Sequence, residues 1–318
     1  FVYWEFFPDS PRAKKPGGTK NFGEMCDLWF ATKGRLASKS LNQYRNALGV
    51  WKGMFGEATP MDKLTHATVA AKVGSHPWAS AKLLNNYLIC LRGVFKLAGR
   101  EMDLSNPMDG IENSKHQATP PDPLSRAEMD LVLKTMADMK MPAEAICYFE
   151  FAFMTGMRPE EIIALKWDDV DFASNTANVS RARTDGEYKP LKTYNARTVD
   201  LVNRAMEALV TMSRVGAASE FVFQNPVTKR PWHDERSQRD HYWKPALKKA
   251  GIRYRRAYQT RHTYATNALS AGVNPTYISR QMGHANAKML FTVYAKWIDG
   301  SDRGREKAKL EAMLGGAE

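Results

Sequence analysis

The chain has few cysteines, and it has no segment that would place it in a membrane or in the secretory pathway. Its three cysteines, Cys26, Cys90 and Cys147, are odd in number, widely spaced and without a CxxC or Cys/His ligand pattern. Such cysteines predict reduced, structural thiols rather than a disulfide scaffold or a metal site. No apolar run approaches the roughly 20 residues that cross a bilayer, and no signal peptide opens the chain. We therefore expect a cytoplasmic protein with no membrane partner.

The motifs of nucleotide-dependent and metal-dependent enzymes are missing as well. The sequence contains no P-loop, no acidic metal-binding cluster, no internal repeat and no low-complexity tract. Acidic residues are outnumbered, with 34 Asp and Glu against 46 Lys and Arg, so that the 318 residues have a net charge of +12. A basic protein favours a polyanionic partner because binding releases condensed counterions. We expect no cofactor and no metal, and a nucleic acid as the partner.

Proline-rich and glycine-rich stretches divide the chain into domains. Residues 1–19 begin with a strand-like apolar run and continue as a basic Pro/Gly connector, which suggests the remnant of a longer N-terminal region. Residues 20–115 carry apolar positions at helical spacing and predict a small helical domain. Residues 116–124 are polar and proline-rich and predict a linker. A second domain is expected over residues 125–318.

Local signals predict the helices of the first domain. The apolar positions between Leu41 and Phe55 are spaced by three and four residues, which puts them on one helix face, with Ser40 as the expected N-cap. Residues 84–95 repeat the arrangement and predict a second helix.

In the second domain Ser125 and Glu128 form a capping box that opens a helix. Gly156 is expected to end the next helix, and Pro159 fits the first turn of another. Period-two patterns then predict short strands at 170–172, 177–181 and 197–201, and from about 202 onward the chain is expected to be mostly helical. The fold class is therefore mainly α with a small antiparallel β-sheet.

Groups that bind or attack phosphate gather in the second domain. Phosphodiester transfer without a metal needs cations on the non-bridging oxygens, an in-line nucleophile and an acid for the leaving oxygen. Arginine suits the first task because its planar fork binds phosphate oxygens bidentately. Arg158 and Arg261 are the candidates. Arg158 stands at a helix start, where its charge opposes the helix dipole, and this conflict favours an anion bound there.

Two segments resemble the conserved boxes of the tyrosine recombinases, the phage integrase family. Residues 158–171 (RPEEIIALKWDDVD) are similar to the first box, with an arginine three residues before a glutamate. Residues 258–263 (YQTRHT) are similar to the second box, His-x-x-Arg-His-Thr, except that Tyr258 stands in the place of the first histidine. The resemblance covers residues 122–298, and it implies a helical core-binding (SAM-like) domain in front of the catalytic domain, the two forming a clamp around DNA.

The resemblance also implies the remaining catalytic residues. Met282-Gly283-His284 corresponds to the family's Leu-Gly-His, which makes His284 a donor to the phosphate, and Tyr294 corresponds to the nucleophile. Lys192 corresponds to the mobile lysine that protonates the leaving 5′ oxygen, with Lys189 as the competing assignment.

Tyr258 departs from the family pattern, and this affects which groups can donate or accept protons in the reaction. A phenol with a pKa near 10 is a poor base beside an imidazole with a pKa near 6.5, so Tyr258 is expected to donate a hydrogen bond to the phosphate. The base is then water, Lys192 or the neighbouring His262. We otherwise assign His262 a supporting role beside the catalytic residues. Glu161 either orients Arg158 or is a surface glutamate.

A dense basic segment leads into the second box, and we expect it to contact DNA phosphates. The residues assigned to this contact are Arg236, Arg239, Lys244, Lys248, Lys249, Arg253, Arg255 and Arg256. A solvated helix face is the alternative explanation of such a charge run. The amphipathic segment 302–314 is expected to be a helix that packs on a neighbouring protomer or on its own domain.

The resemblance implies a site-specific DNA recombinase, a phage or prophage integrase that acts through a 3′-phosphotyrosyl intermediate. Its partners would be double-stranded attachment sites, further copies of the chain in a tetramer, and accessory bending or directionality factors, at the nucleoid of a bacterial host. Residues 1–19 would then be what remains of an arm-binding domain. The alternatives are a catalytically impaired DNA-binding descendant of an integrase, and an enzyme similar to type IB topoisomerases.

Overall fold

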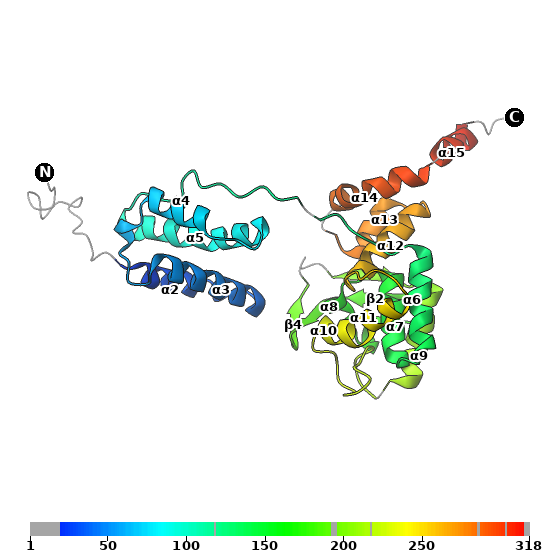
Figure 1. Cartoon of the computed structure of the whole chain (residues 1–318). Helices are drawn as coiled ribbons and strands as arrows, with labels where there is room; N and C mark the ends of the chain where they lie inside the picture. The colour runs from blue at the N-terminus through cyan, green and yellow to red at the C-terminus, as the bar shows by residue number, and fades with distance from the viewer. Residues whose placement is uncertain are drawn as a thin grey trace, which may run out of the picture. The chain divides into compact units, whose positions relative to one another are not determined.

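The computed structural model describes residues 20–117, 119–191, 196–216, 218–284, 287–302 and 304–314. The chain divides into two compact units, Phe1–Ala118 and Thr119–Glu318 (Figure 1). The strand-like start expected within residues 1–19 lies outside the described residues. None of the helices described is both long and apolar enough to cross a membrane.

The first unit is helical throughout its described part. Its elements are α2 (Phe22–Ala31), α3 (Ser38–Phe55), the 3₁₀ turn η1 (Met61–Lys63), α4 (His66–Ser75) and α5 (Ala81–Met102). The expected apolar stripe of α3 is confirmed, because Leu48, Trp51 and Phe55 are buried in the core of this unit. The expected N-cap is wrong. The N-cap is Ala37, three residues earlier, and α3 begins at Ser38, because the backbone carbonyl of Ala37 accepts the first helical hydrogen bonds.

Close packing in the first unit depends on Gly93, which lies in α5 against the ring of Trp29. A Cβ atom at this position would overlap that ring, whereas a Cβ at Gly49 in α3 would meet nothing within 4 Å. We expect Gly93→Ala to lower the free energy of unfolding by about 1–3 kcal/mol through overpacking. The matched change Gly49→Ala should raise it by roughly 0.5–1 kcal/mol. Thermal unfolding of both variants checks this, and equal shifts would contradict it.

The second unit combines helices with two small antiparallel sheets, which confirms the predicted fold class. The elements up to and including the last strand are α6 (Arg126–Asp138), α7 (Ala143–Thr155), α8 (Pro159–Ile163), η2 (Trp167–Asp169), β1 (Val170–Asp171), β2 (Thr176–Val179), β3 (Arg181–Thr184), β4 (Glu187–Pro190) and β5 (Arg197–Asp200). After them come α9 (Asn203–Val215), α10 (Glu235–Gln238), η3 (Arg239–Trp243), α11 (Lys244–Lys249), α12 (Gln259–Ser270), α13 (Pro275–Met282), α14 (Ala287–Asp302) and α15 (Arg305–Leu314).

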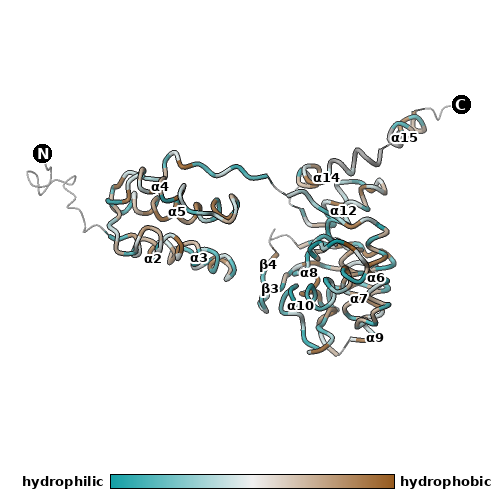
Figure 2. Tube along the Cα trace, in the orientation of Figure 1, coloured by the Kyte–Doolittle hydropathy of each residue, from teal (hydrophilic) through white to brown (hydrophobic). Residues whose placement is uncertain are grey.

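Helix α7 forms the centre of this unit. It is apolar along most of its length (Figure 2), and Phe149, Phe151 and Phe153 are buried in the main core. Helices α6, α9 and α12 pack against it. The predicted helix signals are confirmed, since Ser125 and Glu128 cap α6 reciprocally and Gly156 ends α7 in the left-handed conformation.

The strands were predicted in part. β1, β2 and β5 form one antiparallel sheet in the order β1-β2-β5, with Ala177 opposite Val199. β3 and β4 form a separate hairpin that the sequence pattern did not predict, because most of its side chains are polar and Ala182 is its one fully buried hydrophobic residue among those described. Asp185 and Gly186 at its turn both have positive φ, as a tight hairpin turn requires.

From α9 onward the described chain is mostly helical, as expected, but one stretch after α9 is not. Residues 219–234 form a loop in which Phe221 bridges to Lys166 and Gln224 to Pro231. Its apolar core, Val222 and Phe223, is fully buried. A short apolar run of this kind cannot be told from a helix by periodicity alone.

Candidate active site

Arg158 lies at the junction between α7 and α8, where the sequence forces a sharp change of direction. Gly156 takes φ +60°, and its Cα packs so closely on Tyr264 that a side chain would overlap the ring. Pro159 then starts α8. The Arg158 backbone N–H donates to Glu161 Oε2 at 2.9 Å and its guanidinium donates to Glu161 Oε1 at 2.7 Å. Burial lowers the pKa of Arg158, but the charge of Glu161 more than offsets this and the pKa is raised.

Arg261 lies in the first turn of α12 and is only 2% exposed. Its Nη1 donates to the backbone carbonyl of Gly156 at 2.6 Å, so the turn that places Arg158 also anchors Arg261. Burial lowers the pKa of Arg261, and the nearby charge of Arg158 lowers it further. A buried cation held by a neutral carbonyl is electrostatically unsatisfied, which favours binding of an anion beside it.

Tyr294 and His262 meet across the interface between α14 and α12. The Tyr294 hydroxyl and His262 Nδ1 are 2.5 Å apart, and Tyr294 is 2% exposed in a small core with Ala265, Ile278 and Leu290. Burial raises the pKa of Tyr294, although Arg261 opposes this. Burial and the charge of Arg261 lower the pKa of His262 to about 4. His262 is therefore a neutral ring near pH 7, placed to accept a proton.

His284 follows the left-handed Gly283 at the end of α13. Its backbone N–H donates to Ser279, and its buried Nδ1 has no hydrogen-bond partner among the residues that the structure describes. Burial lowers its pKa to about 4, helped by the charges of Arg261, Arg158 and Arg197. Arg158 Nη2 lies 3.4 Å from the carbonyl oxygen of Gly283, so His284 directly follows a residue that contacts this arginine.

Tyr258 caps the start of α12 and is 36% exposed. Its ring centroid lies 5.5 Å from that of His262. It therefore stands at the open side of the cluster, while His262 occupies the position next to the Tyr294 hydroxyl.

Lys192 lies outside the described residues. The competing Lys189 is in β4, 3.8 Å from Glu187, and lines a hollow of about 440 Å³ with Lys166, Arg181 and Tyr188.

Arg197 is a site residue that the motif comparison did not single out. Its Nη2 donates to Glu161 Oε2 at 2.7 Å and its Nη1 to Oε1 at 3.1 Å, so Glu161 lies between Arg197 and Arg158. Glu161 is 2% exposed, which rules out the reading as a surface glutamate. The sequence held one signal for Arg197. It shares a strand face with buried Val199, and an arginine on an inward face needs a charged partner.

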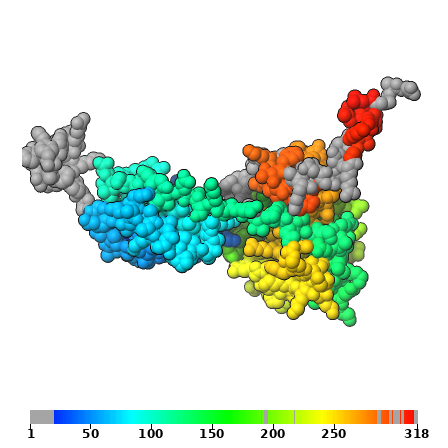
Figure 3. Space-filling view, turned by 45° about the horizontal axis from the view of Figure 1, so that its top comes forward, coloured from blue at the N-terminus to red at the C-terminus, as the bar shows by residue number. Residues whose placement is uncertain are grey.

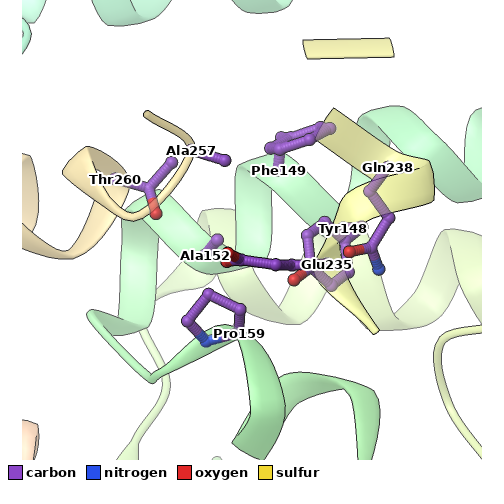
Figure 4. Close-up of a pocket in the computed structure, with 8 residues that line it drawn as sticks. All are labelled: Tyr148, Phe149, Ala152, Pro159, Glu235, Gln238, Ala257 and Thr260. Carbon is purple, nitrogen blue, oxygen red and sulfur yellow. The ribbon is translucent and has the colours of Figure 1, made fainter. Parts of the chain in front are cut away.

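A small pocket lies next to the segments that carry Arg158 and Arg261. Pro159 and Thr260, the neighbours of Arg158 and Arg261, line it together with Tyr148, Gln238 and others (Figure 4). Its volume of about 10 Å³ is that of roughly one water molecule. The pocket is therefore too small for a substrate group.

The basic segment lies on the surface of the second unit, in yellow in Figure 3, but several of its charges are paired. Arg236 pairs with Asp234 and Asp185, and Arg239 and Lys244 pair with Asp240. The ligand atoms of Asp185, Asp234 and His233 lie within 4.8 Å of one another, but Arg236 already pairs with both carboxylates.

The C-terminal part of the segment has two kinds of arginine. Arg253 is exposed and pairs with Asp122. Arg255 is only 12% exposed and binds Glu128 and Asp122, which joins the segment to the start of α6. Lys248, Lys249 and Arg256 are exposed. Arg255 thus has a structural task, whereas the exposed members are free to meet a polyanion from solvent.

Comparisons of the whole sequence agree with the site. Residues 123–299 match the phage integrase family. The chain is 30% identical to IntQ of Escherichia coli strain K12, which carries the name of a defective protein, over 96% of this chain and 87% of IntQ. It is 28% identical to the prophage integrase IntR of the same strain, over 99% of this chain and 86% of IntR.

Solved structures share the fold. The Tn1549 transposon integrase in complex with a circular intermediate DNA has a TM-score of 0.76 at 18% identity, over 91% of this chain and 99% of that chain. Lambda integrase, solved as a tetramer bound to a Holliday junction, has a TM-score of 0.71 at 15% identity, over 94% of this chain and 85% of that chain. The extent of the sequence matches decides the family: the chain belongs to the phage integrase family, the tyrosine-type site-specific recombinases.

Proposed function

We propose that this chain cuts and rejoins double-stranded DNA at attachment sites, with Tyr294 as the nucleophile. The Tyr294 oxygen bonds to the scissile phosphorus and the bond to the 5′ oxygen breaks, which leaves a 3′-phosphotyrosyl link and a free 5′ hydroxyl. A partner strand's 5′ hydroxyl reverses the step, and the covalent link conserves the bond energy. The observation that carries this proposal is the contact of the Tyr294 hydroxyl with His262, beside buried Arg261.

The arginines and His284 supply the charge that the reaction needs. Arg158 and Arg261 bind the non-bridging oxygens, since each has guanidinium N–H groups beyond those used on Glu161 and Gly156. His284 donates from its ring to the same oxygens. Tyr258, at the open side, adds a hydrogen bond from its phenol, and Lys192 protonates the leaving 5′ oxygen. The exposed basic residues contact the flanking phosphates.

His262 accepts the proton of Tyr294 in this proposal, in the place of the histidine that Tyr258 replaces. With the ring hydrogen on Nε2, Nδ1 accepts from the Tyr294 hydroxyl at 2.5 Å. The low pKa keeps the ring neutral in the free protein. A phosphate bound to Arg158 and Arg261 offsets their charges, which raises the proton affinity of His262 when the reaction requires it.

A pH profile of cleavage tests this assignment. Because the pKa of His262 is about 4 in the free protein, we expect the cleavage rate at subsaturating DNA, which reports the free protein, to be flat near neutral pH and to fall as the pH approaches that value and the ring becomes protonated. In His262→Gln the side chain stays polar but takes up no proton, so the rate should fall by about 10²–10⁴. The remaining rate should rise with pH, as solvent removes the proton.

Tyr258→Phe is the matched control for that profile. It removes a hydroxyl at the same face of the site, and we expect a loss of up to about tenfold, the worth of one hydrogen bond. A His262→Gln variant that cleaves at the native rate, or a Tyr258→Phe loss as large as the His262→Gln loss, would place the base elsewhere.

The domains and partners follow the same proposal. Residues 20–115 act as the core-binding domain, 116–124 as the linker and 125–318 as the catalytic domain, and the two domains clamp the duplex. Helix α15 exposes Leu310, Met313 and Leu314, which suits packing on a neighbouring protomer in a tetramer. Accessory bending or directionality factors complete the assembly on the DNA of a bacterial host. The DNA-bound integrases that share this fold support these assignments.

Two assays separate this function from its alternatives. A nicked suicide substrate carrying the attachment site traps the covalent adduct, and a protein that binds this DNA without forming an adduct would be a catalytically impaired descendant. Strand exchange between paired sites then separates a recombinase from an enzyme similar to type IB topoisomerases, which would relax supercoiled DNA without exchanging partners.

A further inference from the structure

We propose that Arg197 is a positioning residue for DNA cleavage, because it holds Glu161 so that this carboxylate fixes Arg158 without neutralising it. The inference rests on the proposed function, in which Arg158 binds the scissile phosphate. Arg197 itself touches no reacting atom in this account. It acts through Glu161 on one side and through the end of α13 on the other.

The contact between Arg197 and Glu161 is a buried two-point fork. The Arg197 side chain is 7% exposed and the Glu161 side chain 2%, and both guanidinium N–H groups bind carboxylate oxygens at 2.7 and 3.1 Å. A fork of this kind fixes the plane of the carboxylate as well as its distance. A lysine in the place of Arg197 would carry the same charge but could not fix the plane of the carboxylate.

The charges explain why two arginines are needed. Glu161 neutralises one positive charge, so the group of Glu161, Arg158 and Arg197 keeps one for the phosphate. With Arg197 in place, Arg158 gives only Nη1 to Glu161, at 2.7 Å, while Nη2 points to the carbonyl of Gly283 at 3.4 Å. Without Arg197, Arg158 would be the one arginine left to pair with the buried Glu161 carboxylate among these contacts. The carboxylate would then draw both terminal nitrogens of Arg158 away from the phosphate.

A second set of contacts connects Arg197 to the segment that carries His284. Arg197 Nε donates to the Gln281 carbonyl at 2.8 Å. A Cβ at Gly283 would lie 2.7 Å from Arg197 Nη1, so the guanidinium packs directly on the backbone that precedes His284. The side chain of Gln281 binds Asp200 of the same strand, at 2.8 and 2.9 Å. Arg197 therefore joins α8, β5 and the end of α13 at one point.

The test compares cleavage of a suicide substrate by the full chain and by Arg197→Met, Glu161→Gln and the double variant. We expect Arg197→Met to slow cleavage by about 100-fold, the scale of losing one fixed donor at the transition state, with near-native DNA binding. The double variant should cleave faster than Arg197→Met, since it no longer contains an uncompensated buried carboxylate. The cleavage rate of Arg197→Lys should lie between the rates of Arg197→Met and the native chain.

The pH dependence distinguishes this role from simple stabilisation. In the native chain the fork helps to keep the pKa of Glu161 low against the effect of burial. Without Arg197 that pKa rises, so lowering the pH protonates Glu161 and releases Arg158. The ratio of native to Arg197→Met rates should therefore shrink as the pH is lowered. Loss of His262 function at acid pH affects both proteins and cancels in the ratio.

Arg204→Met is the matched control, because Arg204 also donates to two carboxylates, those of Glu150 in α7 and Asp130 in α6. It should cleave within about twofold of the native chain, as expected for a pair that does not contact the reacting groups. Native cleavage rates in Arg197→Met, or a double variant slower than Arg197→Met with a constant pH ratio, would overturn the inference. Absence of an adduct with the native chain would instead overturn the proposed function.

Discussion

We expect the replacement of Tyr294 by phenylalanine to abolish the covalent protein–DNA adduct and to leave DNA binding intact. The change removes one oxygen from a side chain that is 2% exposed and packed among Leu290, Ile278 and Met282. The ring keeps its place, and the fold loses one hydrogen bond, to His262, worth about 1 kcal/mol. We expect no other group in the described cluster to take over as nucleophile, because the arginines and His284 bind phosphate oxygens in the proposed mechanism.

Gel analysis of a suicide substrate measures this result directly. Native chain and Tyr294→Phe are incubated with the same nicked attachment site, and binding is followed on the same samples by mobility shift. Tyr258→Phe is the control, since it removes a phenol from the same site and should still give the adduct. An adduct that persists in Tyr294→Phe would contradict the assignment of the nucleophile.

Replacing Arg261 by methionine separates catalysis from stability. Arg261 is buried against a neutral carbonyl, and burial lowers its pKa, so the folded protein gains little from its charge. Methionine fills a similar volume without a buried charge. We expect the free energy of unfolding to stay within about 1 kcal/mol of the native value, because the lost hydrogen bond from Nη1 to Gly156 offsets the removal of the charge. Cleavage should fall by about 10³ or more, since the phosphate loses a preorganised bidentate donor.

Arg204→Met provides the contrast. Arg204 binds Glu150 at 2.8 Å and Asp130 at 3.0 Å, and its side chain is 34% exposed. Its replacement should lower stability by up to about 1 kcal/mol, the scale of a partly exposed ion pair, with cleavage unchanged. Denaturant unfolding and single-turnover cleavage give both quantities. A large loss of stability in Arg261→Met would show that Arg261 is mainly a structural residue.

The parts of the site that follow from local chain geometry could be predicted from the sequence. Gly156 and Pro159 end one helix and start the next, which leaves Arg158 at the junction between them. Gly283 similarly ends α13 and places His284 directly after it. These positions depend on residues within a few places of one another, so a single sequence is enough to find them.

The contacts that depend on packing between distant segments could not be predicted. His262 lies 32 residues from Tyr294, and only the packing of α12 against α14 brings the two together. Arg197 and Glu161 are 36 residues apart. Arg253, in the basic segment, pairs with Asp122, 131 residues away, so the charge run alone did not show which members are free for DNA.

The most direct measurement of the central claim is to identify the residue that carries the DNA. The native chain is trapped on a suicide substrate, the adduct is digested with a protease and a nuclease, and mass spectrometry locates the tyrosine that retains the 3′-phosphonucleotide. The account predicts this mass on the peptide that contains Tyr294. The same mass on the peptide of Tyr258, which stands at the open side of the cluster, would contradict it.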